Sequence, residues 1–171
     1  MLRRLIIFAF VGMALGLLDF FVKSWVSTHI PLMGTVSFQY PYGGIAVFQN
    51  FSGIDFSINH VINTGAAWGI LATFSKPLFI LRIIVVIALF IYALFFNEKR
   101  ERDLPFLLIL TGALGNIIDF FIYGHVIDMF YFVFWGYSYP VFNLADSWIC
   151  IGISLLVLYS LFPKKHVQSI N

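Results

Sequence analysis

Charged residues are scarce in this sequence. Of its 171 residues 11% are charged, as eight Asp and Glu and ten Lys and Arg, whereas 61% are hydrophobic and 19% are aromatic. Soluble globular chains carry about 25% charged residues. This composition excludes a soluble globular domain, and it also excludes a disordered chain, which needs low hydrophobicity. Most of the protein surface must face lipid.

Cysteine is almost absent, and the charge is nearly balanced. Cys150 is the single cysteine, and the formal net charge is +2. One cysteine cannot form an internal disulfide or a multi-thiolate metal site. The small positive excess does not indicate a polyanionic partner, so we expect no binding of nucleic acid.

Four apolar segments have the length that a transmembrane helix needs, about 20 residues. They cover residues 5–22, 77–96, 104–122 and 146–162. The first follows Arg3 and Arg4 and has the alternative interpretation of a cleaved secretory signal, against which its helix-length apolar run argues. We expect residues 1–171 to form a single integral membrane domain with an all-α core, a four-transmembrane-helix bundle.

Basic residues predict the orientation of this bundle. Most of those outside the spans lie before the first, between the second and third, or after the fourth, as Arg3, Arg4, Lys99, Arg100, Arg102, Lys164 and Lys165. The loop 119–146 has no Lys or Arg. Because short cytoplasmic loops carry the excess of Lys and Arg, both termini are predicted to lie in the cytoplasm.

The segment 24–76 is then extracytoplasmic and too long for a turn. Short β-prone runs alternate in it with Gly, Pro and Asn, which predicts a small β-rich unit between spans one and two. The other outer loop, 123–142, is rich in aromatic residues, which prefer the membrane–water interface.

The acidic residues separate into two groups by side of the membrane. Those of the cytoplasmic loop, Glu98, Glu101 and Asp103, have the ordinary interpretation of a solvated turn of mixed charge. The others lie on the outer side or at the outer ends of spans, as Asp19, Asp55, Asp119, Asp128 and Asp146. Asp55 belongs to a Ser/Gly-rich turn and is expected to be an ordinary loop residue. An acid at the bilayer centre costs about 2.5–3.5 kcal/mol, which makes the remaining four functional candidates.

The spacing of these acids indicates paired carboxylates. Asn116 precedes Asp119 by three residues, as Asn143 precedes Asp146, so within a helix each amide can orient its own carboxylate. Asp128 lies between the two pairs, and no Lys or Arg is near to neutralise them. Two carboxylates that approach each other share a proton, which suits an aspartic hydrolase. Asp146 has the alternative role of a simple N-cap of the fourth span.

Other reactive residues give weaker signals. Cys150 lies one helical turn after Asp146 but has no histidine near it in sequence, so it is expected to be a small, apolar membrane residue. His60 and His125 form no ligand-spaced pair, and we expect no metal. The small residues of 65–67 and 112–115 are expected to allow close helix or backbone approach.

Four motifs occur in a fixed order along the chain. They are Asn63-Thr64-Gly65-Ala66-Ala67-Trp68, Gly112-Ala113-Leu114-Gly115-Asn116-Ile117-Ile118-Asp119, Val126-Ile127-Asp128-Met129 and Phe142-Asn143-Leu144-Ala145-Asp146-Ser147. Together with the four spans they closely resemble the bacterial lipoprotein signal peptidases, the signal peptidase II family, over nearly the whole chain.

The resemblance implies an intramembrane aspartic endopeptidase that needs no cofactor. Such an enzyme removes the signal peptide of a prolipoprotein by cleaving on the amino side of its diacylglyceryl-modified cysteine. Asp128 and Asp146 match the catalytic pair of the family. Other residues match positions that bind substrate or support the site in the family: Asp19, Lys23, Asn63, Gly65, Asn116, Asp119, Asn143 and Ala145. The resemblance further implies a monomer in contact with membrane lipid in the cytoplasmic (inner) membrane, with the site facing outward and the segment before Lys76 forming a β-cradle.

Two departures from the family pattern stand out. Phe120 follows Asp119 where the family usually has arginine, and the family's polar residues between Asp19 and Lys23 are missing. Asp19 and Lys23 themselves remain, at a helical spacing that allows them to pair. Arg82 in the second span is the candidate to replace the missing arginine. Two other functions stay open: a proton-coupled conduit, and a noncatalytic lipid- or peptide-binding protein.

Overall fold

The computed structural model describes residues 2–36, 38–65 and 72–162, and it contains four helices long and apolar enough to cross a membrane. They are α1 (Leu2–His29), α2 (Ser75–Phe95), α3 (Asp103–Tyr123) and α4 (Leu144–Leu161). The short 3₁₀ helices η2 (Ala72–Phe74) and η3 (Arg100–Arg102) precede α2 and α3. The predicted four-helix membrane core is thereby confirmed.

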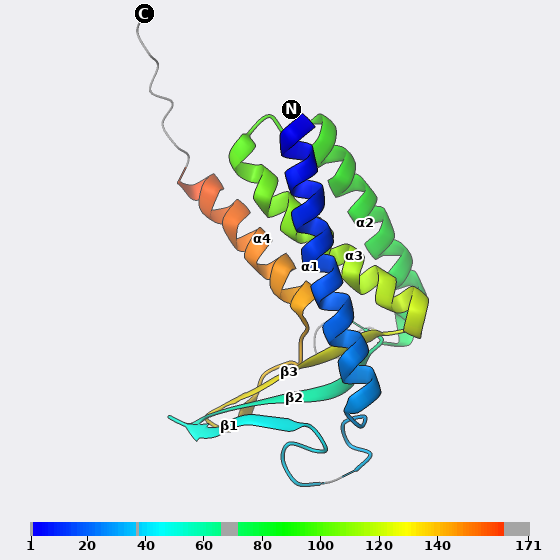
Figure 1. The fold of residues 1–171 in the computed structure, drawn as a ribbon, viewed down its shortest axis with the longest axis vertical. Helices are drawn as coiled ribbons and strands as arrows, with labels where there is room; N and C mark the ends of the chain where they lie inside the picture. The colour runs from blue at the N-terminus through cyan, green and yellow to red at the C-terminus, as the bar shows by residue number, and fades with distance from the viewer. Residues whose placement is uncertain (1, 37, 66–71, 163–171) are drawn as a thin grey trace, which may run out of the picture.

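A four-stranded antiparallel sheet lies at one end of the bundle (Figure 1). Its order is β1-β2-β3-β4, with bounds β1 (Ile45–Phe51), β2 (Ile54–Asn63), β3 (Val126–Phe134) and β4 (Tyr137–Ser138). The strands expected between spans one and two are β1 and β2. The loop 123–142, expected to be only an aromatic interface loop, contributes β3 and β4, because aromatic and β-branched residues fit a strand as well as an interface.

Helix α1 is longer than the sequence indicates. It continues to His29, beyond the predicted end of the span at residue 22. Its last turns pack on the sheet, where Val26 contacts the fully buried Ile127 and Met129 of β3. The helix continues past Lys23, and the side chain of Lys23 is 0% exposed, so this charged residue lies inside the fold and not at the end of the span.

Helix α3 contacts all three other helices, and a glycine allows its closest approach to α4. A Cβ added at Gly112 would overlap the carbonyl oxygen of Ala145 and lie 2.9 Å from Cγ1 of Ile149. Helix α4 also has a glycine at this crossing: a Cβ added at Gly152 would lie 2.8 Å from the carbonyl oxygen of Pro105. The close-packing interpretation of the stretch 112–115 is confirmed at Gly112; in the stretch 65–67, residues 66 and 67 lie outside the described residues.

This crossing predicts a stability effect. Gly112→Ala is expected to destabilise the protein by about 1–3 kcal/mol, because the added methyl group must push the backbone of α4 away. Thermal unfolding of the purified protein in detergent measures the loss. Gly16→Ala in α1 is the matched control, since its methyl group meets only Cγ2 of Thr111 at 3.9 Å, an ordinary contact. Equal unfolding temperatures for the two variants would contradict the prediction.

Candidate functional site

A buried lysine organises the polar end of the bundle. Nζ of Lys23 lies 2.7 Å from Oδ2 of Asp19 and 2.7 Å from Oδ2 of Asp119, and it donates a hydrogen bond of 2.9 Å to Oδ1 of Asn116. These three partners match the three donors of an ammonium group. Asp19 and Asp119 are 2% and 1% exposed, so both carboxylates bind the ammonium away from water. The predicted pairing of Asp19 with Lys23 is confirmed.

The same two carboxylates hold the elements that carry the other aspartates. Oδ1 of Asp19 accepts a 2.9 Å hydrogen bond from the backbone N–H of Ala145, in the first turn of α4. Oδ2 of Asp119 accepts a 3.5 Å hydrogen bond from the backbone N–H of Ile127 in β3. Because the first N–H groups of a helix have no partner within it, a carboxylate at this place is stabilising. The lysine cluster therefore fixes the start of α4 and the start of β3.

Asp128 lies in β3, is 2% exposed and is held by two amides. Nδ2 of Asn63 donates to its Oδ2 at 2.8 Å, and Nδ2 of Asn143 donates to its Oδ1 at 2.7 Å. Asn63 lies in β2 and pairs with Val126 of β3, two residues before Asp128, so Asn63 and Asp128 are diagonal neighbours in the sheet. Burial, with the nearby charge of Asp146, raises the pKa of Asp128 to about 7.

Asp146 lies in the first turn of α4 and is also bound by amides. Nδ2 of Asn116 donates to its Oδ1 at 2.8 Å, and the backbone N–H of Asn143 donates to its Oδ2 at 3.2 Å. Oδ1 of Asn143 accepts from the backbone N–H of Asp146 at 2.8 Å, which completes a capping box. Asn143 is therefore the N-cap, and the alternative that gave this role to Asp146 is wrong.

The side-chain amides of Asn116 and Asn143 orient aspartates other than those that the sequence predicts. Asn116 does not orient Asp119, which binds Lys23, but orients Asp146 on the neighbouring helix. The side-chain amide of Asn143 donates to Asp128. Spacing along one helix indicated the right residues, but the side-chain amides of both asparagines bind carboxylates of other elements, and Asn143 contacts Asp146 through the capping box.

The two carboxylates have different surroundings. Amide and backbone donors stabilise the anion at both, whereas burial and the nearby charge of Asp146 favour the protonated form of Asp128. A pair with one ionised and one protonated carboxyl group offers both a base and an acid.

Two further candidates lie apart from this pair. Cys150 is exposed. A ring nitrogen of His60 lies 3.0 Å from the carbonyl oxygen of Ile30. Within the described ranges, no three His, Cys, Asp or Glu side chains are grouped as a metal would require.

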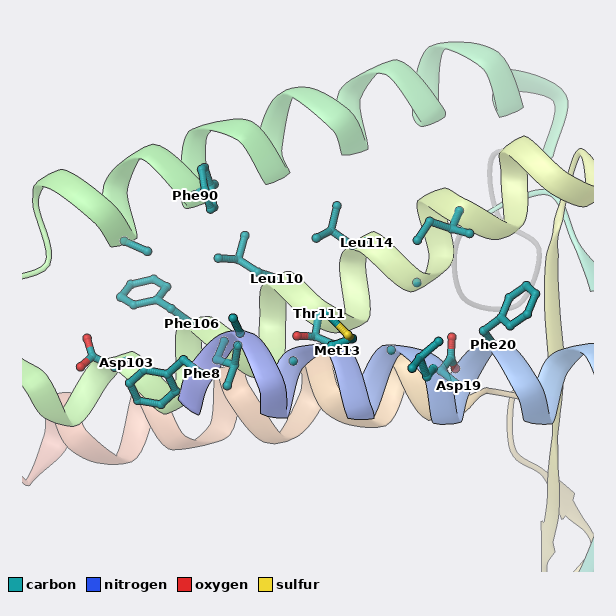
Figure 2. A pocket seen from close by; sticks show the side chains of 18 of the residues that line it. Phe8, Met13, Asp19, Phe20, Phe90, Asp103, Phe106, Leu110, Thr111 and Leu114 are labelled. Carbon is teal, nitrogen blue, oxygen red and sulfur yellow. The ribbon is translucent and has the colours of Figure 1, made fainter. Parts of the chain in front are cut away.

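A groove of about 880 Å³ runs between α1, α2 and α3. Figure 2 shows it from Asp103 at one end to Asp19 at the other, with mainly apolar side chains such as Phe8 and Leu110 along it. Its lining includes Asp19 and Asp119 but neither Asp128 nor Asp146. The groove therefore meets the lysine cluster and does not contain the carboxylate pair.

Four membrane-length helices and a pair of amide-held carboxylates define the class, an integral membrane protein with a two-aspartate site. The model of the family described as signal peptidase (SPase) II matches residues 11–162. The chain belongs to this family of aspartic peptidases and is a multi-pass membrane protein of bacterial type.

Individual relatives and a solved structure agree with this assignment. The lipoprotein signal peptidase of Chlamydia pneumoniae is 33% identical over 152 residues, which cover 87% of this chain and 90% of the relative. The lipoprotein signal peptidase of Azoarcus sp. (strain BH72) is 40% identical over 129 residues, or 73% and 71% of the two chains. A bacterial membrane enzyme solved by the in meso method at 2.3 Å resolution superposes with a TM-score of 0.76 at 27% identity, over 96% of this chain and 93% of that one.

The buried ammonium predicts a second stability effect. Lys23→Met is expected to cost about 3–5 kcal/mol, because it leaves Asp19 and Asp119 buried without their cation. Thermal unfolding in detergent measures this loss. Lys76→Met, at an exposed position of α2, is the matched control and should unfold near the wild-type temperature. A Lys23→Met protein as stable as this control would show that the cluster does not hold the fold.

Proposed function

We propose that Asp128 and Asp146 are the catalytic pair of a lipoprotein signal peptidase. Family membership supports the peptidase activity, and the observation that carries the assignment is the pair of amide-held carboxylates that meet at the sheet end of the bundle. The substrate is a prolipoprotein, cleaved on the amino side of its diacylglyceryl-modified cysteine. No metal or organic cofactor takes part in this reaction.

The environments of the two carboxylates suggest their roles. Asp146 lies at a helix N-terminus and binds two donors, which stabilises its anion, so it is the base that deprotonates water. Asp128 holds the shared proton, since its pKa is about 7. It donates a hydrogen bond to the scissile carbonyl oxygen as water attacks the carbon. It then gives its proton to the leaving nitrogen, while the proton taken by Asp146 restores the pair.

The sheet offers an apolar surface beside this pair. Alternate residues of β3 share a face, so Phe130 and Phe132 project on the same side as Asp128. The ring of Phe132 stacks on Phe56 at 4.3 Å between centroids and on Phe142 at 6.1 Å. A lipid-modified peptide bound on this face of the sheet would contact these rings beside Asp128.

The membrane arrangement belongs to the same proposal. Both termini lie in the cytoplasm, and the sheet and the carboxylate pair face the extracytoplasmic side. The excess of basic residues at the termini and in the loop between α2 and α3 supports this orientation. The enzyme works as a monomer, since both carboxylates and their amides come from one chain.

Replacement of either carboxylate tests the assignment. Asp128→Asn and Asp146→Asn are each expected to abolish cleavage, because an amide can neither deprotonate water nor pass on the shared proton. Release of signal peptide from a diacylglyceryl-modified prolipoprotein, by purified protein in detergent, is the measurement. Asp55→Asn is the matched control: Asp55 lies in β2 and not in the predicted turn, and it accepts a hydrogen bond from the backbone N–H of Asn50 in β1. Full activity in either of the first two variants would refute the pair.

The raised pKa predicts the dependence of activity on pH. Above about 7 Asp128 loses the shared proton, so kcat/KM is expected to fall about tenfold per pH unit on the alkaline side. Samples returned to pH 6 before assay separate this reversible loss from unfolding. A kcat/KM that stays constant from pH 6 to pH 9 would contradict Asp128 as the proton holder.

A further inference from the structure

Arg82 is a charged residue inside a membrane-length helix. It is the eighth residue of α2, about 10 Å from the helix start, and it is half-buried. An arginine within a membrane span costs about 2.5–3.5 kcal/mol at the bilayer centre and is retained where it has a partner or a function. Its contacts therefore indicate what it does.

A chain of three hydrogen bonds joins Arg82 to Asp128. Nη2 of Arg82 donates to the carbonyl oxygen of Gly65 at 2.7 Å. The backbone N–H of Gly65 donates to Oδ1 of Asn63 at 3.0 Å, and Nδ2 of Asn63 donates to Oδ2 of Asp128 at 2.8 Å. The guanidinium thus holds Gly65, whose own backbone N–H binds the side-chain amide of Asn63.

The charge of Arg82 also acts directly on the carboxylate pair. It interacts electrostatically with both Asp146 and Asp128. Among the residues that the structure describes, the ion pairs within 4.0 Å are those of Lys23, so Arg82 attracts the pair from beyond that distance. Gly65 takes one of the five N–H donors of the guanidinium. A substrate backbone between Arg82 and the pair would find both a cation and N–H donors.

The face of α2 that carries Arg82 packs against residue 120. Phe79 precedes Arg82 by three residues and so lies on the same face of the helix. The ring of Phe79 stacks on Phe120 of α3, with centroids 4.2 Å apart and planes 18° from parallel. Positions 82 and 120 therefore lie on the faces of α2 and α3 that pack against each other.

We propose that Arg82 is a positioning residue of the peptidase and supplies from α2 the cation that the family usually carries at position 120. It holds the Gly65–Asn63 turn against Asp128 and presents its cation to the backbone of the substrate near the scissile bond. This inference rests on the proposed catalytic pair, and its test is separate from the test of that pair.

Two substitutions of Arg82 separate its charge from its shape. Arg82→Gln removes the cation and is expected to lower kcat about 10- to 100-fold, as loss of a supporting partner does. It should also move the pH profile of kcat/KM upward by about one unit, because the lost cation had favoured the ionised pair. Arg82→Lys keeps the cation without the planar fork, so it should lower kcat but leave the pH profile in place.

The pH profile responds to every charge around the pair. The groups that act on it are Asp19 and Lys23 from α1, Arg82 from α2, Asp119 from α3, Asp146 from α4 and Asp128 from β3. Lys76→Gln, an exposed position of the same helix, is the matched control for the loss of one positive charge and should leave kcat and the profile unchanged. Thermal unfolding of each variant shows whether it is folded.

A rescue variant tests the shared region. Phe120→Arg introduced into Arg82→Gln is expected to raise kcat above that of Arg82→Gln and to return the pH profile toward the wild type. A folded Arg82→Gln enzyme with the wild-type kcat and profile would overturn the inference, as would equal losses in Arg82→Gln and Arg82→Lys with the profile unmoved. Both results leave the catalytic pair standing if Asp128→Asn and Asp146→Asn remain inactive. Activity in those two variants would refute the proposed pair, whatever Arg82 does.

Discussion

The ammonium of Lys23, buried between two carboxylates, is the contact on which the polar end of the bundle depends. Removing a charge from water costs several kcal/mol, which is recovered only when opposite charges and hydrogen bonds fully replace the solvent. Asp19, Asp119 and Asn116 provide that replacement. Because these partners stand on α1 and α3, and because Asp19 also binds the N-terminus of α4, a single cation joins three helices. The sheet is tied to the same point through Asp119.

The cluster acts on the carboxylate pair without neutralising it. Lys23 touches Asn116, and Asn116 in turn donates to Asp146, so an amide separates the cation from the pair. An ammonium bound directly to Asp146 or Asp128 would favour the fully ionised pair and leave no acid. The asparagines supply donors that carry no net charge. The pair is therefore held in place while the proton that it needs is retained.

The sequence predicts the membrane core and the polar residues better than it predicts their partners. Apolar length sufficed for the four helices, since a lipid-facing helix shows its nature in composition alone. The three-residue spacing of Asn116 and Asp119 described one helix face correctly, yet the partner of Asn116 is on α4. Lys23 marked the end of a span by its charge and is instead buried, because Asp119 and Asn116, distant in sequence, bind it together with the nearby Asp19. Strand β3 went unpredicted because pairing with β2, more than local propensity, defines it.

Position 120 illustrates how such a site tolerates change. In a helix bundle the side chains of one site come from facing helices, so more than one helix can supply a given group. Phe120 supplies no cation at its position on α3, but its stacking on Phe79 joins α2 to α3 near Arg82, which donates to the carbonyl of Gly65. The Phe79–Phe120 contact and the Arg82–Gly65 hydrogen bond therefore belong to one packing arrangement of α2. The motif at 119–120 departs from the family pattern, while both carboxylates and all three asparagines around them keep their contacts.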